Sequence, residues 1–287
     1  MKSKTRIWLG VGAFVVAGTG AGQFPAANDL AARPLEPPIT VGGLKNDVST
    51  PQAAPARVHL AGGEGGEGGE AGIDVAAAAN DPVEYGVALQ VIAAHYYAGL
   101  AAYEANEFEA GAQMFAHGLS EVYVEMEDIL RQRGVTTLGK KLEAAVEGAS
   151  EKLPPPQIRQ RVRAVLDALA AAEKASPVSA GPVQVTRVQV VANLLNRAAT
   201  QYSVSLNDKN LEPYLDGLGF AVAARTEAAK ILPWLRGRDK QKAAAISAAL
   251  ALAKQAYPGI RRPSAQLPTG RFLAASSSAM LAVSNWK

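Results

Sequence analysis

A pattern of helix-length segments occurs twice in the chain, at a constant offset of 99 positions. The match covers two such segments and the turn between them, and six residues are identical in both copies. These are Gln90, Val91, Ala93, Tyr103, Gly118 and Leu119, which correspond to Gln189, Val190, Ala192, Tyr202, Gly217 and Leu218. A register kept over this length is typical of a duplicated unit. We therefore expect two related sets of helices.

Helix-forming residues dominate the chain after Asp81, in runs that Gly and Pro separate. The expected helices span 83–104, 107–133, 137–150, 157–174, 185–204, 210–231, 238–256 and 269–283. Eight helices with short connections predict an all-α protein, built from two pseudo-repeated antiparallel four-helix units at 81–176 and 177–287 that pack together. The β-branched run 185–191 leaves a strand as the alternative there.

The first two predicted helices each carry large apolar side chains on one arc, at 100° per residue. The arcs are formed by Tyr85, Leu89, Ile92, Tyr96, Leu100 and Tyr103, and by Phe115, Leu119, Val122, Met126 and Ile129. Packing these faces together closes the first hairpin. Gly99 and Gly118 lie inside these helices, where glycine costs about 1 kcal/mol relative to alanine. They therefore indicate close contacts between backbones.

The first 80 residues have a different composition. Residues 1–21 combine three basic residues with an apolar run and small residues, the layout of a secretory signal peptide. A membrane anchor is the alternative, but the run is shorter than the about 20 residues of a spanning helix. Residues 22–80, rich in Pro, Ala and Gly, predict a disordered tether. Its Glu64, Glu67 and Glu70 either keep it soluble, which we favour, or hold a hard cation.

Charge and cysteine content narrow the choice of partners. The chain has 29 basic and 26 acidic side chains, and Lys2, Lys4 and Arg6 lie in the predicted signal peptide, so the processed chain would be neutral. It lacks the basic field that holds nucleic acid or an anionic membrane surface. Without cysteine, an exported chain must be held together by its core. We expect no nucleic-acid partner and no integral membrane span in the processed chain.

The first hairpin carries a candidate metal site. Glu121 follows His117 by four residues and Glu125 by eight, so the three side chains project from one side of their helix. His95, on the other helix of the hairpin, would add a second imidazole. Imidazole and carboxylate together suit a transition metal such as iron, copper or zinc. A solvated helix face with ordinary ion pairs is the alternative.

The helical wheel places these groups away from the centre of the bundle. His117 lies nearly opposite the apolar arc of its helix, and His95 lies at the edge of its own arc. A site is therefore expected at the surface or at the contact between the two units. In the second copy, positions equivalent to 95, 117 and 121 hold Leu194, Asp216 and Phe220. We therefore expect a site in the first unit only.

The sequence carries no enzyme signature. Ser120 lies close to His117 but lacks the strand, sharp turn and helix that present a hydrolase nucleophile. Phosphate-binding loops, paired zinc-protease histidines and calcium-binding loops do not occur. We therefore expect no catalytic residue and no enzymatic activity.

The chain resembles the imelysin-like family of exported bacterial helical proteins associated with iron uptake. The shared features are the predicted signal peptide, the doubled helical unit over 83–283, and a histidine with a downstream glutamate, His117 and Glu121, in the first half. Three residues separate that pair here, where the family's motif has two. The resemblance implies two four-helix bundles related by duplication and a role in iron uptake.

These patterns together predict an exported, non-enzymatic protein of the bacterial envelope, periplasmic or secreted. We expect it to bind a metal ion or metal complex through His117 and Glu121, with His95 and Glu125 as additional ligands. The alternative is a structural module without metal, whose helical faces dock another envelope protein.

Overall fold

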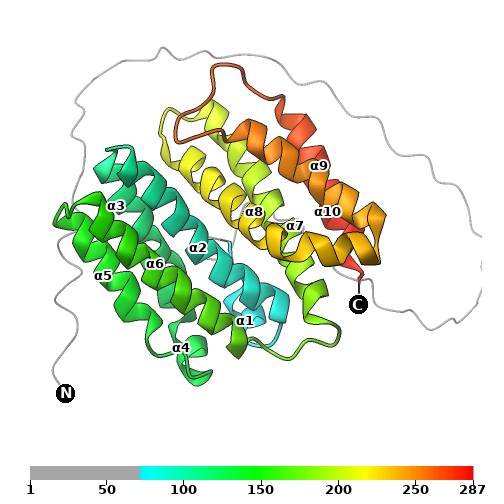
Figure 1. Cartoon of the computed structure of the whole chain (residues 1–287), viewed down its shortest axis with the longest axis horizontal. Helices are drawn as coiled ribbons and strands as arrows, with labels where there is room; N and C mark the ends of the chain where they lie inside the picture. The colour runs from blue at the N-terminus through cyan, green and yellow to red at the C-terminus, as the bar shows by residue number, and fades with distance from the viewer. Residues whose placement is uncertain (1–71, 287) are drawn as a thin grey trace, which may run out of the picture. The chain divides into compact units, whose positions relative to one another are not determined.

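Helices form most of residues 72–286, the part of the chain that the computed structural model describes (Figure 1). The first set comprises α1 (Val75–Ala78), α2 (Pro82–Glu104), α3 (Phe108–His117), the π-helix η2 (Gly118–Tyr123), α4 (Val124–Gln132), α5 (Leu138–Ser150), α6 (Pro155–Ala172) and the 3₁₀ turn η3 (Glu173–Ala175). The second comprises α7 (Val183–Asn207), α8 (Glu212–Arg238), α9 (Lys240–Ala256) and α10 (Thr269–Ser284). These residues contain no strand, so the all-α prediction is confirmed.

The helix boundaries follow local chemistry. Asp81 caps α2 by accepting a hydrogen bond from the backbone N–H of Val83 at 2.7 Å, and Pro82 occupies the first turn. Asp239 caps α9 in the same way. The expected helix 210–231 is longer than predicted, because α8 continues through Pro233 and buries Leu235. The β-branched run 185–191 is helical, as part of α7.

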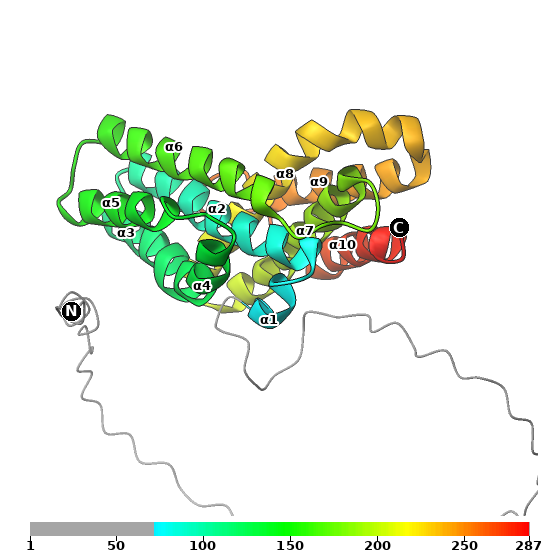
Figure 2. The same cartoon turned by 90° about the horizontal axis from the view of Figure 1, so that it is seen from below.

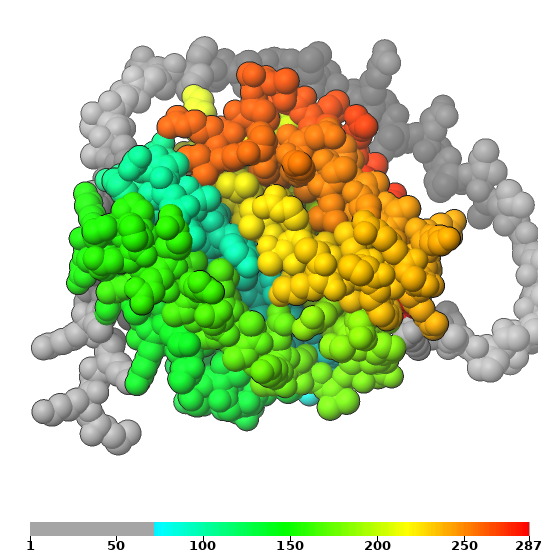
Figure 3. Space-filling view, viewed as in Figure 1, coloured from blue at the N-terminus to red at the C-terminus, as the bar shows by residue number. Residues whose placement is uncertain are grey.

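The two sets of helices meet around α2. On one side α2 packs against α3 and α6, and on the other against α7 and α8 (Figures 1 and 2). One hydrophobic core runs through both sets, and all described residues belong to one compact unit. In the space-filling view, the cyan and green surface of the first set meets the yellow surface of the second directly (Figure 3). The two sets share the predicted order of four long helices, while their descent by duplication stays a prediction.

This central position buries α2 on nearly all sides. Fifteen of its 23 residues are buried, among them the polar Gln90 and His95. A helix covered from two directions has no solvent-facing stripe. The helical wheel predicts His95 at the edge of the apolar arc. His95 is buried because α8 covers the face of α2 that the first hairpin leaves open.

Glycines allow the helices around α2 to approach closely. A Cβ added at Gly99 would lie 2.6 Å from the ring of Phe115 on α3, and one at Gly111 would lie 2.8 Å from the carbonyl oxygen of Gly99. On the other side, a Cβ at Gly219 of α8 would overlap the carbonyl group of Ala94. Gly99 therefore allows the close backbone contact that the sequence predicts for it. Gly219 brings α8 onto α2 beside His95.

The folded region begins earlier than expected. Residues 72–80 were assigned to the tether, but Ile73 is buried in the core and α1, capped by Asp74, packs against α2. A helix of only four residues leaves little trace in composition. The predicted signal peptide and residues 22–71 lie outside the described residues. Within residues 72–286, no helix is both long and apolar enough to cross a membrane.

We expect Gly219→Ala to lower the free energy of unfolding by about 1–3 kcal/mol, because the new methyl group would force α8 away from the backbone of α2. Gly237→Ala is the matched control on the same helix, since nothing lies within 4 Å of a Cβ added there. That variant should be neutral or more stable by up to about 1 kcal/mol. Urea unfolding measures both, and equal effects would contradict the close contact.

Candidate metal centre

Three of the four predicted ligands come together where α2, α3 and η2 meet. One ligand atom from each of His95, His117 and Glu121 lies within 4.8 Å of the other two. His95 comes from α2, His117 ends α3, and Glu121 lies on η2. The two imidazole rings are 6.3 Å apart, in an edge-to-face arrangement. Three donor atoms this close together are near enough to share one metal ion.

The fourth predicted ligand, Glu125, lies apart from this group. It is exposed on α4. It lies eight positions after His117, with the π-helix η2 between them. Side chains on one side of a helix share an ion only when they are about one turn apart, and Glu125 is two turns away.

The π-helix η2 and a glycine position Glu121. The side chains of His117 and Glu121 approach to 3.6 Å between Nδ1 and Oε1, one turn apart. Gly118 starts the π-helix between them, and a Cβ there would lie 3.1 Å from the Cβ of His95. The missing side chain lets this turn pack directly onto α2. Single π-helical turns occur often at functional sites, where they change the register of side chains.

His95 is held in the form that binds metals. Its Nδ1 lies 2.9 Å from the backbone carbonyl oxygen of Val91, which can only accept, so Nδ1 carries the proton and Nε2 has a free lone pair. Burial lowers the pKa of His95 to about 4, and the positive charges of His117 and Arg197 act in the same direction, against the hydrogen bond to Val91. The ring is thus neutral at neutral pH.

Two carboxylates from α8 complete the surroundings of the cluster. Asp216 Oδ1 lies 3.6 Å from His95 Nε2, and Glu212 Oε1 lies 3.5 Å from His117 Nδ1. Glu212 is also bound by Gln113, whose amide donates to Oε2 at 3.0 Å. The centre is therefore at the contact between the two sets of helices, one of the two locations expected from the wheel, and the second set contributes to it.

Asp216 is the most unusual group of the site. Its Oδ1 is buried, and no hydrogen-bond donor from residues 72–286 reaches it. Burial, together with the neighbouring negative charges of Glu212 and Glu121, raises the pKa of Asp216 to about 7. The side chains of His117 and Glu121 keep 18% and 20% of their surface exposed, so solvent reaches the cluster from their side.

Sequence reasoning missed Asp216 and Glu212. Two signals point to them in retrospect. They are two carboxylates four residues apart, the same spacing as between His117 and Glu121. Asp216 also interrupts the otherwise apolar and glycine-containing run 214–220. Asp216 is also the counterpart of His117 in the predicted repeat. The three ligand atoms that converge all belong to the first set, while Asp216 and Glu212 approach them from α8 of the second.

Other polar features near the two sets of helices have local explanations. The hydroxyl of Ser120 donates to the carbonyl oxygen of Ala116 at 2.9 Å, as serines inside helices commonly do.

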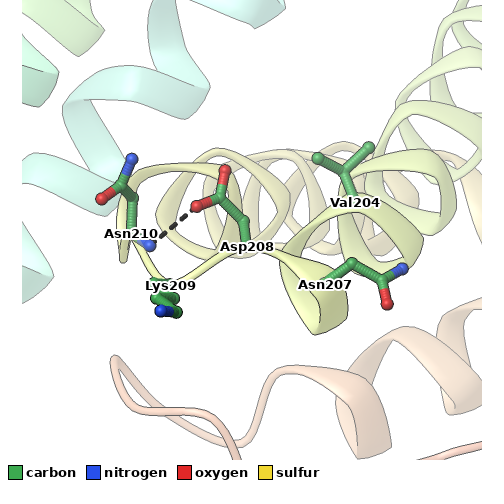
Figure 4. A pocket seen from close by; sticks show the side chains of 5 residues that line it. All are labelled: Val204, Asn207, Asp208, Lys209 and Asn210. Atoms are coloured by element: carbon green, nitrogen blue, oxygen red, sulfur yellow. Dashed lines mark hydrogen bonds between the residues drawn. The ribbon is translucent and has the colours of Figure 1, made fainter. Parts of the chain in front are cut away.

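A surface depression at the α7–α8 connection is lined by Val204 and residues 207–210 (Figure 4). There the backbone N–H of Asn210 donates to Asp208 Oδ1 at 2.8 Å, which forms a turn. None of the ligand atoms of the metal centre lines this depression.

In metal-free protein, we expect Asp216→Asn to increase stability at pH 8 by about 1–4 kcal/mol, because a folded-state pKa above the ordinary 3.8 means that ionised Asp216 disfavours folding. This cost develops as pH rises from about 4 to about 7. The gain should therefore shrink as pH is lowered from 8 toward 4. Thermal unfolding in EDTA measures it, with the exposed Glu125→Gln as control. A gain that does not change with pH would contradict the burial of an ionisable carboxyl.

Comparison of the chain with protein-family models, with curated proteins and with solved structures finds no match. The family resemblance drawn from sequence therefore stays a prediction. The chemistry of His95, His117 and Glu121 is the basis for assigning a function.

Proposed function

We propose that the protein binds one transition-metal ion through His95, His117 and Glu121. The observation that carries this proposal is the convergence of the three ligand atoms within 4.8 Å, from three different helical segments. Two imidazoles and one carboxylate are three protein ligands, the number found in sites that keep a further position open. The hydrogen bond from His95 to Val91 supports it, because a fixed tautomer is what a metal-binding histidine needs.

The donor set favours a d-block ion over calcium or magnesium, which prefer oxygen ligands only. Iron, copper and zinc all accept imidazole and carboxylate. A bare ion suits the site better than a metal complex, since the donors converge on the space of a single atom. The partly exposed His117 and Glu121 would let the ion enter and leave.

The proposed role is carriage or capture of the metal rather than catalysis. A site with solvent access and no adjacent nucleophile suits reversible binding, since the hydroxyl of Ser120 is bonded to its own helix. The predicted signal peptide would place the protein in the periplasm or outside the cell. With the imelysin-like resemblance, this makes the supply of iron the role that we propose.

The proposal predicts that the full chain binds one equivalent of Zn²⁺ or Fe²⁺. The double variant His117→Ala/Glu121→Ala should bind the ion at least about 100-fold more weakly, because a single remaining imidazole cannot hold it. Isothermal titration calorimetry on the full chain measures this. Glu125→Ala is the control, since Glu125 lies on the same side of the helix but is exposed. Equal weak binding by wild type and double variant would overturn the proposal.

A further inference from the structure

Resting on the proposed function, we infer that Asp216 of α8 is a fourth ligand, so that the bound ion joins the first set of helices to the second. The site would then have two nitrogen and two oxygen donors, with His95, His117 and Glu121 from one set and Asp216 from the other. This donor set suits a four-coordinate divalent ion such as Zn²⁺ or Co²⁺.

The contact between His95 and Asp216 is the first support. Nε2 of His95 carries a lone pair, because the ring proton is on Nδ1, and a carboxylate oxygen is also an acceptor. Two acceptors that face each other at 3.6 Å repel unless a positive charge lies between them. Two ligands bound to one tetrahedral ion at 2.0–2.2 Å are about 3.4 Å apart. The observed separation is close to that value and too long for a hydrogen bond.

The environment of Asp216 is the second support. Its Oδ1 is buried and accepts no hydrogen bond from the described part of the chain, whereas buried oxygens are almost always satisfied. Only 17% of the side chain is exposed. A bound cation would satisfy this oxygen.

The packing of α8 is the third support. Gly219 lies three residues after Asp216 and brings α8 into contact with the backbone of Ala94, next to His95. Gly217, immediately after Asp216, is packed against the hydroxyl of Tyr257, which donates to the carbonyl of Ala198 at 2.7 Å. These contacts fix the segment that carries Asp216 from two sides. A rigid, preformed position is what an effective metal ligand requires.

Glu212 also lies close to a histidine of the cluster, but it differs from Asp216 in its exposure and its hydrogen bonding. Its side chain is 41% exposed, and one oxygen already accepts a hydrogen bond from Gln113. It is one turn from Asp216 on the same helix, and its other oxygen faces His117. Its exposure and its hydrogen bond to Gln113 place it outside the proposed coordination sphere, which makes it a matched control.

A thiolate placed at position 216 gives the most direct test. The chain has no cysteine, so a thiolate-to-cobalt charge-transfer band in the near ultraviolet of Asp216→Cys would report a bond between residue 216 and the ion. We expect this band when the variant is loaded with one equivalent of Co²⁺. Glu212→Cys, loaded in the same way, should lack it.

Affinity gives an independent readout. Asp216→Asn should bind Co²⁺ at least about tenfold more weakly and lose the intense visible bands of four-coordinate cobalt, because water replaces the carboxylate. Glu212→Gln should keep those bands, with an affinity within a few-fold of wild type. Circular dichroism confirms that each variant is folded.

The outcomes separate the inference from the proposed function. If wild type binds Co²⁺ but Asp216→Cys binds it without a charge-transfer band, or Asp216→Asn keeps the wild-type spectrum, Asp216 is not a ligand and the three-residue site stands. If wild type binds neither Co²⁺ nor Zn²⁺, the proposed function fails, and this inference fails with it.

Discussion

The burial of α2 between two sets of helices is the constraint on which the rest of the structure depends. Contact from both sides requires small residues where backbones meet, and Gly99 and Gly219 supply them on opposite faces. It also requires a partner for each polar side chain that α2 carries inside. Gln90 donates to Glu173 at 2.9 Å, and His95 donates to its own helix at Val91. Nε2 of His95 faces the carboxyl group of Asp216, which can donate a hydrogen bond only when it is protonated.

Most of the fold could be predicted because its signals are local. Helix-forming residues, with Gly and Pro between them, placed the long helices to within a few residues, except for the end of α8. The expected helix ends at residue 231, but the apolar face of α8 continues past Pro233 to Leu235, and burial outweighs the missing hydrogen bond. The start at Ile73 and the π-helix at Gly118 escaped prediction because both depend on what packs against them.

The part of the candidate site that lies within the first hairpin could be predicted from the sequence. Four-residue spacing linked Glu121 to His117, and the hairpin brought His95 to them. The helical wheel groups Glu125 with His117 and Glu121 because all three lie on one side of the helix. It does not show the rise along the helix axis, which separates Glu125 from the other two. Asp216 was beyond reach for another reason. Its proximity to His95 depends on how α8 crosses α2, and no pattern within either helix encodes that crossing.

The electrostatics of the centre argue for an ion at this place. Asp216, Glu121 and Glu212 gather around two imidazoles, of which His95 is kept neutral by burial. The mutual repulsion of the carboxylates is part of what raises the pKa of Asp216. An apolar contact between α2 and α8 would be more stable than this arrangement without a cation. The divalent ion proposed above would replace this repulsion by attraction toward a common centre.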